Sequence, residues 1–438
     1  MPTRRPGDSP DPGRRRLMGG ALAATTLMLP ALLRARRGPH VVIVGGGFAG
    51  GACAHWLQRF LPEAVITVVE RQATQVSGYF CNLVLAGLLP EAAIRHALVD
   101  QRRAQVRTLE AEVTGVDPGL RVLRLRDGRR LHYDRLVLAI GIRHRIDAIE
   151  GYGASALRSH PPAWPGTLAD LRQVAARLEA LPQGGVLALV PPPNPYRCPP
   201  GPYERATLFA HRLQARNPRA KVLILDPKDD FTKHALFAEA WANRYPGRVE
   251  WLGRAQGGTP QSLDLRTGHL RLVNGARLRV DWIHYLPPQR AAGLADRLGI
   301  AGVEGWVAVE AEQLRLPGED AIHAIGDAVD LAPMPKSAFA ANEQARRCAA
   351  AIAAAYGADI PPLGWLANTC YSHVGPGQAV SIGALYEAHD GRLAAIAGSH
   401  HITPTGVDRA HAAAESARAH QLYRHLRHIC FNRPASAS

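Results

Sequence analysis

The chain has 438 residues, 47% of them hydrophobic, which is long enough for two or three domains with large cores. Its formal net charge is +15, and residues 1–37 contribute +6 of this through eight Arg and two Asp. No Lys/Arg-rich run follows that segment, and zinc-finger and helix-turn-helix patterns are lacking, so the sequence does not predict nucleic-acid binding.

The first predicted element is an export signal. Arg14-Arg-Arg-Leu-Met resembles a twin-arginine motif, an apolar stretch runs from Leu17 to Leu33, and Leu33-Arg-Ala35 is a plausible cleavage site. A retained membrane anchor is the alternative, but the stretch is short and weakly hydrophobic for a span. We therefore predict a signal peptide over residues 1–37, a periplasmic location and no stable membrane span in the mature chain. Such a compartment is oxidising for thiols.

A glycine loop follows the leader. The β-prone run His40-Val-Val-Ile-Val leads directly into a G-x-G-x-x-G pattern formed by Gly45, Gly47 and Gly50, and a helical segment comes next. In a dinucleotide site these glycines permit the tight turn, the approach of the pyrophosphate and close packing of the helix on the strand. Glu70 ends the next strand at the distance where an acid holds a ribose hydroxyl. The segment predicts a dinucleotide-binding domain.

Two later patterns favour FAD as the dinucleotide. They are Tyr133-Asp-Arg-Leu-Val-Leu-Ala-Ile-Gly141 and Ala321-Ile-His-Ala-Ile-Gly326-Asp327. They resemble the strand-plus-glycine signal and the second flavin motif of flavoproteins with two dinucleotide-binding domains, in which the Asp binds the ribityl chain. Gly326-Asp327 alone suits a simple turn equally well, but three motifs in the family order predict FAD rather than NAD.

The second nucleotide site expected of such proteins is missing from the sequence. Gly184-Gly-Val-Leu-Ala-Leu-Val190 predicts a buried strand, but Pro191-Pro-Pro-Asn-Pro follows it instead of a glycine loop. Without that loop nothing cradles a second pyrophosphate. We therefore expect the second domain to keep its fold without a nicotinamide site, and the substrate to be something other than NAD(P)H.

Six cysteines lie at positions 53, 81, 198, 348, 370 and 430, and none belongs to a Cys-x-x-Cys-His motif, so no c-type haem attaches to this chain. Cys198 opens Cys198-Pro-Pro-Gly-Pro-Tyr-Glu204, whose prolines predict a stiff loop that cannot continue a helix. Cys370 lies in Asn368-Thr-Cys-Tyr-Ser, also predicted as a turn. From the cysteines alone, a structural disulfide or two unrelated buried thiols is favoured over chemistry on sulfur. The 19 histidines show no tight metal-binding spacing, so no metal is expected.

Taken together, these motifs resemble the flavoprotein subunit of flavocytochrome c sulfide dehydrogenase, a relative of sulfide:quinone oxidoreductase. The glycine loop, Arg197-Cys-Pro-Pro-Gly-Pro-Tyr-Glu-Arg205, Leu286-Pro-Pro-Gln-Arg290, Gly326-Asp327-Ala, Pro333-Met-Pro-Lys336 and the Cys370 segment carry this resemblance over nearly all of the chain after the leader.

The resemblance implies a site and a partner. It implies that Cys198 and Cys370 form a redox-active disulfide beside the flavin, with Glu204 as acid/base and sulfide as substrate. It also implies a c-type cytochrome subunit as electron acceptor. The basic charge would suit an anionic substrate such as hydrosulfide or an acidic partner, and equally a solvated Arg-biased surface. The residues expected to bind FAD are Gly45, Gly47, Gly50, Glu70, Gly141, Gly326, Asp327 and Lys336.

One position departs from the family pattern. The family often attaches FAD covalently to a cysteine eight residues after the ribose-binding acid, and that position holds Gly78 here, while Cys81 lies three residues later. We therefore expect non-covalent FAD and expect Cys81 to pack as a small apolar residue.

The predicted fold is α/β, with two Rossmann-like dinucleotide-binding domains, the second degenerate, and a C-terminal α+β domain. The predicted segments are 1–37 for the signal peptide, 38–155 and 291–355 for the FAD-binding domain, 156–290 for the second domain and 356–438 for the C-terminal domain. Two other functions stay open. A sulfide:quinone oxidoreductase would need an apolar surface, which the C-terminal helix does not offer, and a non-catalytic flavoprotein scaffold would need neither cysteine motif.

Overall fold

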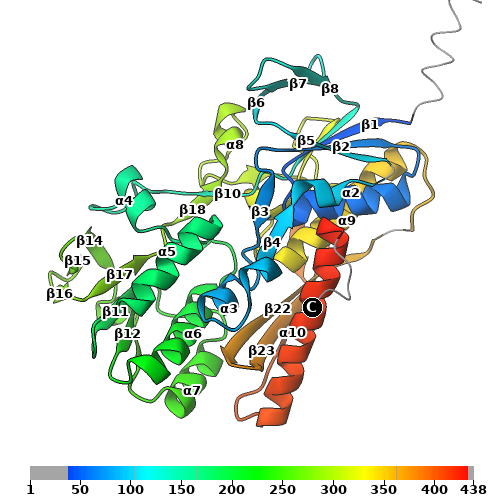
Figure 1. Cartoon of the computed structure of the whole chain (residues 1–438). Helices are drawn as coiled ribbons and strands as arrows, with labels where there is room; N and C mark the ends of the chain where they lie inside the picture. The colour runs from blue at the N-terminus through cyan, green and yellow to red at the C-terminus, as the bar shows by residue number, and fades with distance from the viewer. Residues whose placement is uncertain (1–37, 104, 165, 362, 433–438) are drawn as a thin grey trace, which may run out of the picture.

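The computed structural model describes residues 38–103, 105–164, 166–361 and 363–432. The predicted signal peptide, residues 1–37, lies outside the described residues. Figure 1 shows two α/β units joined by extended connections, with a long hairpin and a C-terminal helix beside them. This arrangement agrees with the predicted fold class, while the segment boundaries proposed above stay predictions.

The first unit is built on a five-stranded parallel sheet in the order β20-β9-β1-β2-β5. The strand β20 follows the second unit in the sequence and joins this sheet beside β9. Helices α2 and α9 pack against each other on this unit. The elements are β1 (His40–Val44), α2 (Phe48–Phe60), β2 (Val65–Glu70), β5 (Val106–Glu110), β9 (Arg135–Leu138), β20 (Ile322–Ala324) and α9 (Ala338–Ala355).

Close packing explains two glycines of the first loop. Gly45 has φ of +106°, and a Cβ there would lie 2.2 Å from the carbonyl oxygen of Ala139. A Cβ on Gly50 would lie 1.8 Å from the carbonyl oxygen of Gly45. The turn and the approach of α2 to β1 therefore both require glycine, as the sequence predicts.

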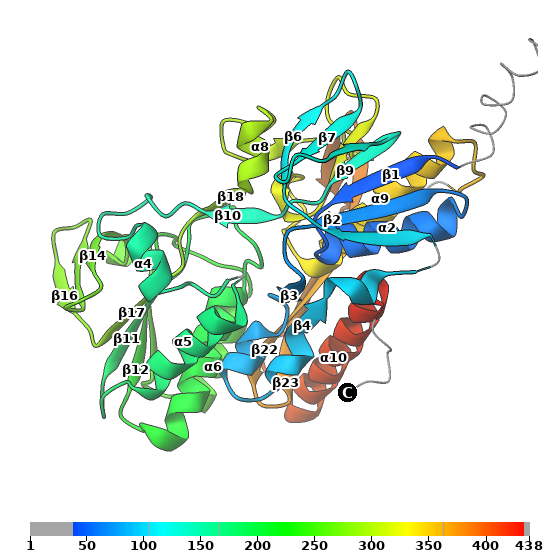
Figure 2. The same cartoon turned by 45° about the horizontal axis from the view of Figure 1, so that its top comes forward.

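The second unit has a four-stranded parallel sheet in the order β13-β12-β11-β17. A three-stranded antiparallel meander, β14-β15-β16, adjoins it, and the antiparallel pair β10–β18 forms where the chain passes between the units (Figure 2). The elements are β10 (Ile142–His144), α4 (Ala154–Ser159), α5 (Leu168–Glu179), β11 (Val186–Val190), α6 (Gly201–Arg216), β12 (Lys221–Leu225), α7 (His234–Arg244), β13 (Val249–Leu252), β14 (Pro260–Asp264), β15 (His269–Leu272), β16 (Arg277–Arg279), β17 (Trp282–Tyr285) and β18 (Gln289–Ala291).

The C-terminal part is a long hairpin covered by a helix, as the predicted α+β domain requires. It comprises β22 (Trp365–Gly375), β23 (Gln378–His389), β24 (Arg392–Ala395), β25 (His401–Ile402) and α10 (Arg409–Phe431). β22 contacts α6 of the second unit and β23 contacts α10, so the hairpin lies between these two helices (Figures 1 and 2). Its position brings β22 to the beginning of α6.

Short elements complete the described chain. They are β3 (Thr74–Val76), α3 (Cys81–Leu85), β4 (Arg95–Ala97), β6 (Val113–Asp117), β7 (Val122–Leu125), β8 (Arg130–His132), α8 (Gly293–Arg297), β19 (Val307–Ala308) and β21 (Val329–Asp330), with 3-10 turns at Glu91–Ile94, Leu98–Gln101, Arg254–Gln256 and Gly326–Ala328. Among the described residues, no helix combines the length and the apolar character needed to cross a bilayer.

Candidate active site

The Cys198 loop occupies the connection between β11 and α6. In the first unit, the corresponding connection between β1 and α2 is the glycine loop. The sequence predicts a stiff loop over the whole Cys198–Glu204 motif, and this is wrong from Gly201 onward because α6 begins there. Pro202 lies in the first turn of α6, where its missing N–H would have no intrahelical partner in any case. The Cys198 thiol therefore lies just before the N-terminus of α6.

The loop is held tightly around this cysteine. Cys198 has a positive φ of 54°, and its carbonyl oxygen accepts a hydrogen bond of 2.8 Å from the amide of Gly201. A Cβ on Gly201 would lie 1.9 Å from the Trp164 ring and 3.0 Å from the Cys198 Sγ. Only glycine therefore fits at the first position of α6.

Cys370 lies in the middle of the strand β22, opposite Ile382 of β23. The prediction of a turn around Cys370 is therefore wrong, because pairing of β22 with β23 dominates over the local preference of Asn, Thr and Ser for turns. The side chains of Cys198 and Cys370 are in hydrogen-bond contact, and both are free, partly buried thiols in the structure. The fold thus brings together two cysteines that are distant in the sequence.

The two thiols differ in acidity. The hydrogen bond from Cys198 lowers the pKa of Cys370 to about 7, with help from the positive charge of Lys233 and against the effect of burial. The hydrogen bond to Cys370 and burial raise the pKa of Cys198 well above its ordinary value. In the reduced pair, Cys370 is therefore the thiolate and Cys198 the proton donor.

Lys233 is a site residue that the sequence analysis missed. It is 4% exposed, and its Nζ donates hydrogen bonds to the Cys370 carbonyl oxygen at 2.8 Å and to Ser372 Oγ at 2.9 Å. It precedes α7 with a left-handed backbone, φ 68°. No local motif marks it, and only the fold places this buried ammonium group beside the dithiol.

Glu204 lies in the first turn of α6, and its negative charge raises the pKa of both cysteines. Its carboxylate accepts hydrogen bonds from Asn82 Nδ2 at 2.8 Å and from the amide of His373 at 2.7 Å. Burial acts to raise the pKa of Glu204, but the hydrogen bonds and charge of His373, together with Asn82, outweigh burial and lower it. Asn82 and His373 were also missed.

The predicted cofactor residues of the glycine loop lie as a dinucleotide site requires. Glu70 Oε2 accepts a hydrogen bond of 2.9 Å from the amide of Gly46, so the carboxylate adjoins the loop. A Cβ on Gly47 would meet its nearest atom, Gln75 Oε1, at 3.6 Å, so the loop is open on the side where a pyrophosphate would bind. Among the described residues, no side chain caps the N-terminus of α2, and its first turn contains no acidic residue. These features fit the phosphates of FAD.

The second group of predicted cofactor residues lies against the cysteine loop. Arg197 Nε pairs with Asp327 Oδ2 at 2.5 Å, and the amide of Cys198 donates a hydrogen bond of 2.8 Å to the Lys336 carbonyl oxygen. Gly326 and Gly141 adopt positive φ of 81° and 68°. The Gly-Asp turn of one unit therefore contacts the thiol loop of the other, and the dithiol lies beside the expected flavin site.

Lys336 itself is largely buried, with Nζ 3.8 Å from the Trp306 ring centroid. Burial lowers its pKa to about 8, against the charges of Asp327 and Asp330. With this pKa the side chain is mostly a cation at pH 7 and loses its proton as the pH rises through about 8. Its role in FAD binding stays a prediction.

Cys81 packs among buried apolar side chains, as predicted, and it also contacts a cation. It is 3% exposed, burial raises the pKa of its thiol, and Arg205 Nη2 lies 3.6 Å from its sulfur. Arg205 is itself fully buried, and it stacks over Trp164 at 4.6 Å and donates from Nε to Asn82 Oδ1 at 2.9 Å. Cys81 is thus a buried thiol in contact with the guanidinium group of Arg205, the residue that follows Glu204 in the sequence.

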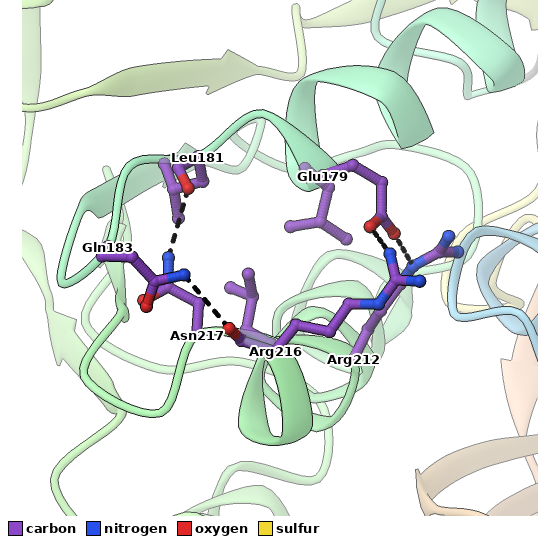
Figure 3. Close-up of a pocket in the computed structure, with 8 residues that line it drawn as sticks. Glu179, Leu181, Gln183, Arg212, Arg216 and Asn217 are labelled. Atoms are coloured by element: carbon purple, nitrogen blue, oxygen red, sulfur yellow. Dashed lines mark hydrogen bonds and ion pairs between the residues drawn. The ribbon is translucent and has the colours of Figure 1, made fainter.

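Two other features of the described residues contribute nothing to this site. No group of His, Cys, Asp and Glu within the described ranges is arranged to hold a metal ion. A small cavity of about 50 Å³ lies in the second unit, where Glu179 forms ion pairs with Arg212 and Arg216 and Gln183 bonds the Arg216 carbonyl (Figure 3). Its polar side chains are paired with one another and it contains no cysteine.

Comparison with known protein families locates three matches in chain order. Residues 39–163 match the pyridine nucleotide-disulphide oxidoreductase family. Residues 172–287 match the central domain of the sulfide dehydrogenase (flavocytochrome c) flavoprotein chain, and residues 362–431 match the flavin-binding domain of flavocytochrome c sulphide dehydrogenase. The central match contains Cys198 and Glu204, and the last contains Cys370.

Individual relatives agree on the fold. A sulfide:quinone oxidoreductase from Aquifex aeolicus superposes with a TM-score of 0.69 at 14% identity, covering 91% of this chain and 93% of the other. Putidaredoxin reductase, in its covalent complex with putidaredoxin, gives 0.63 at 20% identity over 91% and 99%. An NAD(P)H sulfur oxidoreductase (CoA-dependent) of Pyrococcus abyssi is 36% identical over 118 residues. That match spans 25% of this chain and about a quarter, 26%, of that relative's length.

The architecture and these matches define an FAD-binding oxidoreductase of the kind built on two dinucleotide-type domains. Within this class, residues 172–287 and 362–431 match the central and flavin-binding domains of the flavocytochrome c sulfide dehydrogenase flavoprotein chain. The resemblance on which the sequence analysis relied is confirmed.

Proposed function

We propose that the protein is a sulfide dehydrogenase that oxidises hydrosulfide through a Cys198–Cys370 disulfide and FAD, and that a c-type cytochrome accepts the electrons. The contact between the two thiols is the single observation that carries this proposal. Both cysteine residues are only partly buried, which supports access of a small anion to the pair. Lys233 places a positive charge near Cys370.

Hydrosulfide attacks the Cys198 sulfur of the disulfide. A bond forms between the substrate sulfur and Cys198, the Cys198–Cys370 bond breaks, and Cys370 leaves as a thiolate. The positive charge of Lys233 stabilises that thiolate, and a thiol of lowered pKa is the better leaving group. By family resemblance, Cys370 is also the sulfur that faces the flavin.

The electron balance of the cycle is simple. One hydrosulfide yields sulfur at the oxidation level of the element, one proton and two electrons. A second sulfur nucleophile, such as another hydrosulfide, would remove that sulfur from Cys198, and the disulfide would re-form as the Cys198 and Cys370 dithiol gives up the two electrons. FAD, when bound, supplies a two-electron acceptor that can release its electrons singly to a haem. Glu204 takes up the proton and returns it during attack and release.

The connection between β11 and α6 argues against a nicotinamide as reductant. The position of a pyrophosphate cradle is filled by Pro191–Pro193 and by the Cys198 loop. NADH and NADPH at micromolar concentration should therefore leave the flavin oxidised. Rapid bleaching by either nucleotide would contradict this part of the proposal.

We also propose that FAD is held non-covalently and that the protein acts in the periplasm after export by a twin-arginine route, which carries folded, cofactor-loaded proteins. The test of function is to purify the exported protein with whatever accompanies it and record its visible spectrum during addition of sulfide. Flavin bands together with haem bands, both reduced by sulfide, support a cytochrome partner. Flavin reduction followed by electron transfer to a quinone instead of cytochrome c would favour a sulfide:quinone oxidoreductase.

A further inference from the structure

His373 lies three residues after Cys370 on β22, and its side chain is 2% exposed. Its backbone amide donates to Glu204 Oε1 at 2.7 Å, and its Nδ1 lies 3.3 Å from the same oxygen. Its other ring nitrogen, Nε2, lies 3.4 Å from the Ser416 hydroxyl of α10. The imidazole therefore connects the carboxylate beside the dithiol to a different element on the other side.

The α10 side of His373 contains further groups that can hold a proton. The half-buried ring of His420 is 5.7 Å from that of His373, centroid to centroid. Burial and the charge of His373 lower the pKa of His420, so this ring is neutral near neutral pH and can accept a proton. Glu415, next to Ser416, pairs through Oε1 with His411 Nε2 at 3.5 Å. The His411 side chain is 42% exposed, so the partner of Glu415 is open to solvent.

The proposed chemistry requires such a connection. Each hydrosulfide oxidised releases one proton near Glu204, whose side chain is only 13% exposed. Asn82 and His373 favour the ionised form of Glu204, so the carboxylate does not retain a proton for long. The Phe80 ring packs 5.5 Å from the His373 ring, centroid to centroid, on the side facing α3. An imidazole can bind a proton at one ring nitrogen and release one from the other.

We propose that His373 relays protons between Glu204 and the face of α10 formed by Ser416 and His420. The inference rests on the proposed sulfide chemistry and adds a residue that acts through Glu204 rather than on sulfur. The titratable groups that contact His373 are Glu204 from α6 and His420 from α10. Lys233 bonds the neighbouring Ser372, Cys370 lies on the same strand, and Glu415 is next to Ser416 on α10.

His373→Gln tests this role in the FAD-loaded protein. Glutamine keeps the backbone hydrogen bond to Glu204 but cannot carry a proton at neutral pH. Sulfide-dependent bleaching of the flavin should slow by about 10- to 100-fold, with a larger solvent deuterium isotope effect and unchanged FAD content. In His373→Ala, added imidazole should restore much of the rate. The exposed, distant His269→Gln should behave as wild type in every measurement.

A second measurement does not depend on turnover. Loss of the His373 hydrogen bond and charge leaves burial to dominate, so the pKa of Glu204 should rise in His373→Gln. The infrared band of a protonated carboxyl group, assigned by its loss in Glu204→Gln, should therefore appear at higher pH than in wild type.

The possible outcomes distinguish a failure of the proposed relay from a failure of the proposed function. A wild-type rate in His373→Gln overturns the relay. So does a slow rate with no imidazole rescue and no change in isotope effect, because it shows a purely structural role. If sulfide does not bleach wild-type flavin, the proposed function fails. The wild type and His373→Gln are then compared with dithiothreitol as the reductant, which also releases protons at the dithiol. Equal rates of flavin bleaching in the two proteins would overturn the relay.

Discussion

The amide of Cys198 donates a hydrogen bond of 2.8 Å to the carbonyl oxygen of Lys336, so a loop of the second unit is attached directly to the return segment of the first. The ion pair between Arg197 and Asp327 strengthens the same junction. The thiol position is therefore set by the flavin motif and by β22 together. The pairing of Cys198 with Cys370 therefore depends on the packing of the Cys198 loop, the return segment and β22 against one another.

Replacement of either cysteine by serine should leave FAD bound and abolish sulfide-dependent bleaching of the flavin. Serine preserves the size of each side chain but cannot form the disulfide that hydrosulfide attacks. Stopped-flow absorbance of Cys198→Ser and Cys370→Ser, with Cys430→Ser as a buried-thiol control, measures this. Reduction of cytochrome c with sulfide at the wild-type rate in both variants would show the disulfide mechanism to be wrong.

The reduced dithiol should react with iodoacetamide in a pH-dependent way. The thiolate is the reactive form, so the alkylation rate should rise with pH and reach half its maximum near about pH 7, below the ordinary thiol value of about 8.5. Lys233→Met removes the positive charge that favours the thiolate, so its midpoint should move to higher pH. Peptide mass spectrometry identifies Cys370 as the labelled residue. An unchanged midpoint in Lys233→Met would remove Lys233 from the site.

Glu204→Gln should slow sulfide-dependent flavin reduction by about 100-fold while FAD stays bound. The amide can accept the hydrogen bond from the His373 amide but cannot take up a proton, and a positioned acid or base contributes at about this level. The exposed Glu304→Gln serves as a matched control. A wild-type rate in Glu204→Gln across the pH range would exclude Glu204 as the acid/base.

Acid denaturation should release yellow FAD into the supernatant, because Gly78 stands where the family often has its attachment cysteine. Cys81 is an unsuitable substitute in this structure, since its sulfur is buried against Arg205. Absorbance of the supernatant and flavin fluorescence of the precipitated polypeptide check this. Flavin that stays on the wild-type polypeptide but not on Cys81→Ala would identify a covalent bond to Cys81.

Local sequence patterns predicted well the backbone turns of the first unit. The glycine loop and the Gly326-Asp327 turn depend on backbone conformations that few residues adopt, so their patterns are readable without the fold. The beginning of α6 was predicted less well, because the prolines of the motif suit both a loop and the first turn of a helix.

The surroundings of the dithiol could not be predicted in the same way. Lys233, His373 and Asn82 belong to three separate elements, and none occurs in a pattern of its own. They meet only because β22 packs against α6, and that contact joins parts of the chain that are far apart in sequence. The roles of these buried polar groups depend on contacts with residues that lie far from them in the sequence.

The connection between β11 and α6 can hold either a phosphate-binding loop or the Cys198 loop, but not both. A single short loop precedes α6, and its backbone is fixed by the contact of Gly201 with Trp164 and by the bond of Cys198 to the return segment. Rebuilding a phosphate cradle there would require a glycine turn in place of the prolines and would move the sulfur away from Cys370. Acquisition of a pyridine-nucleotide electron donor and loss of the thiol pair would therefore occur in the same evolutionary step.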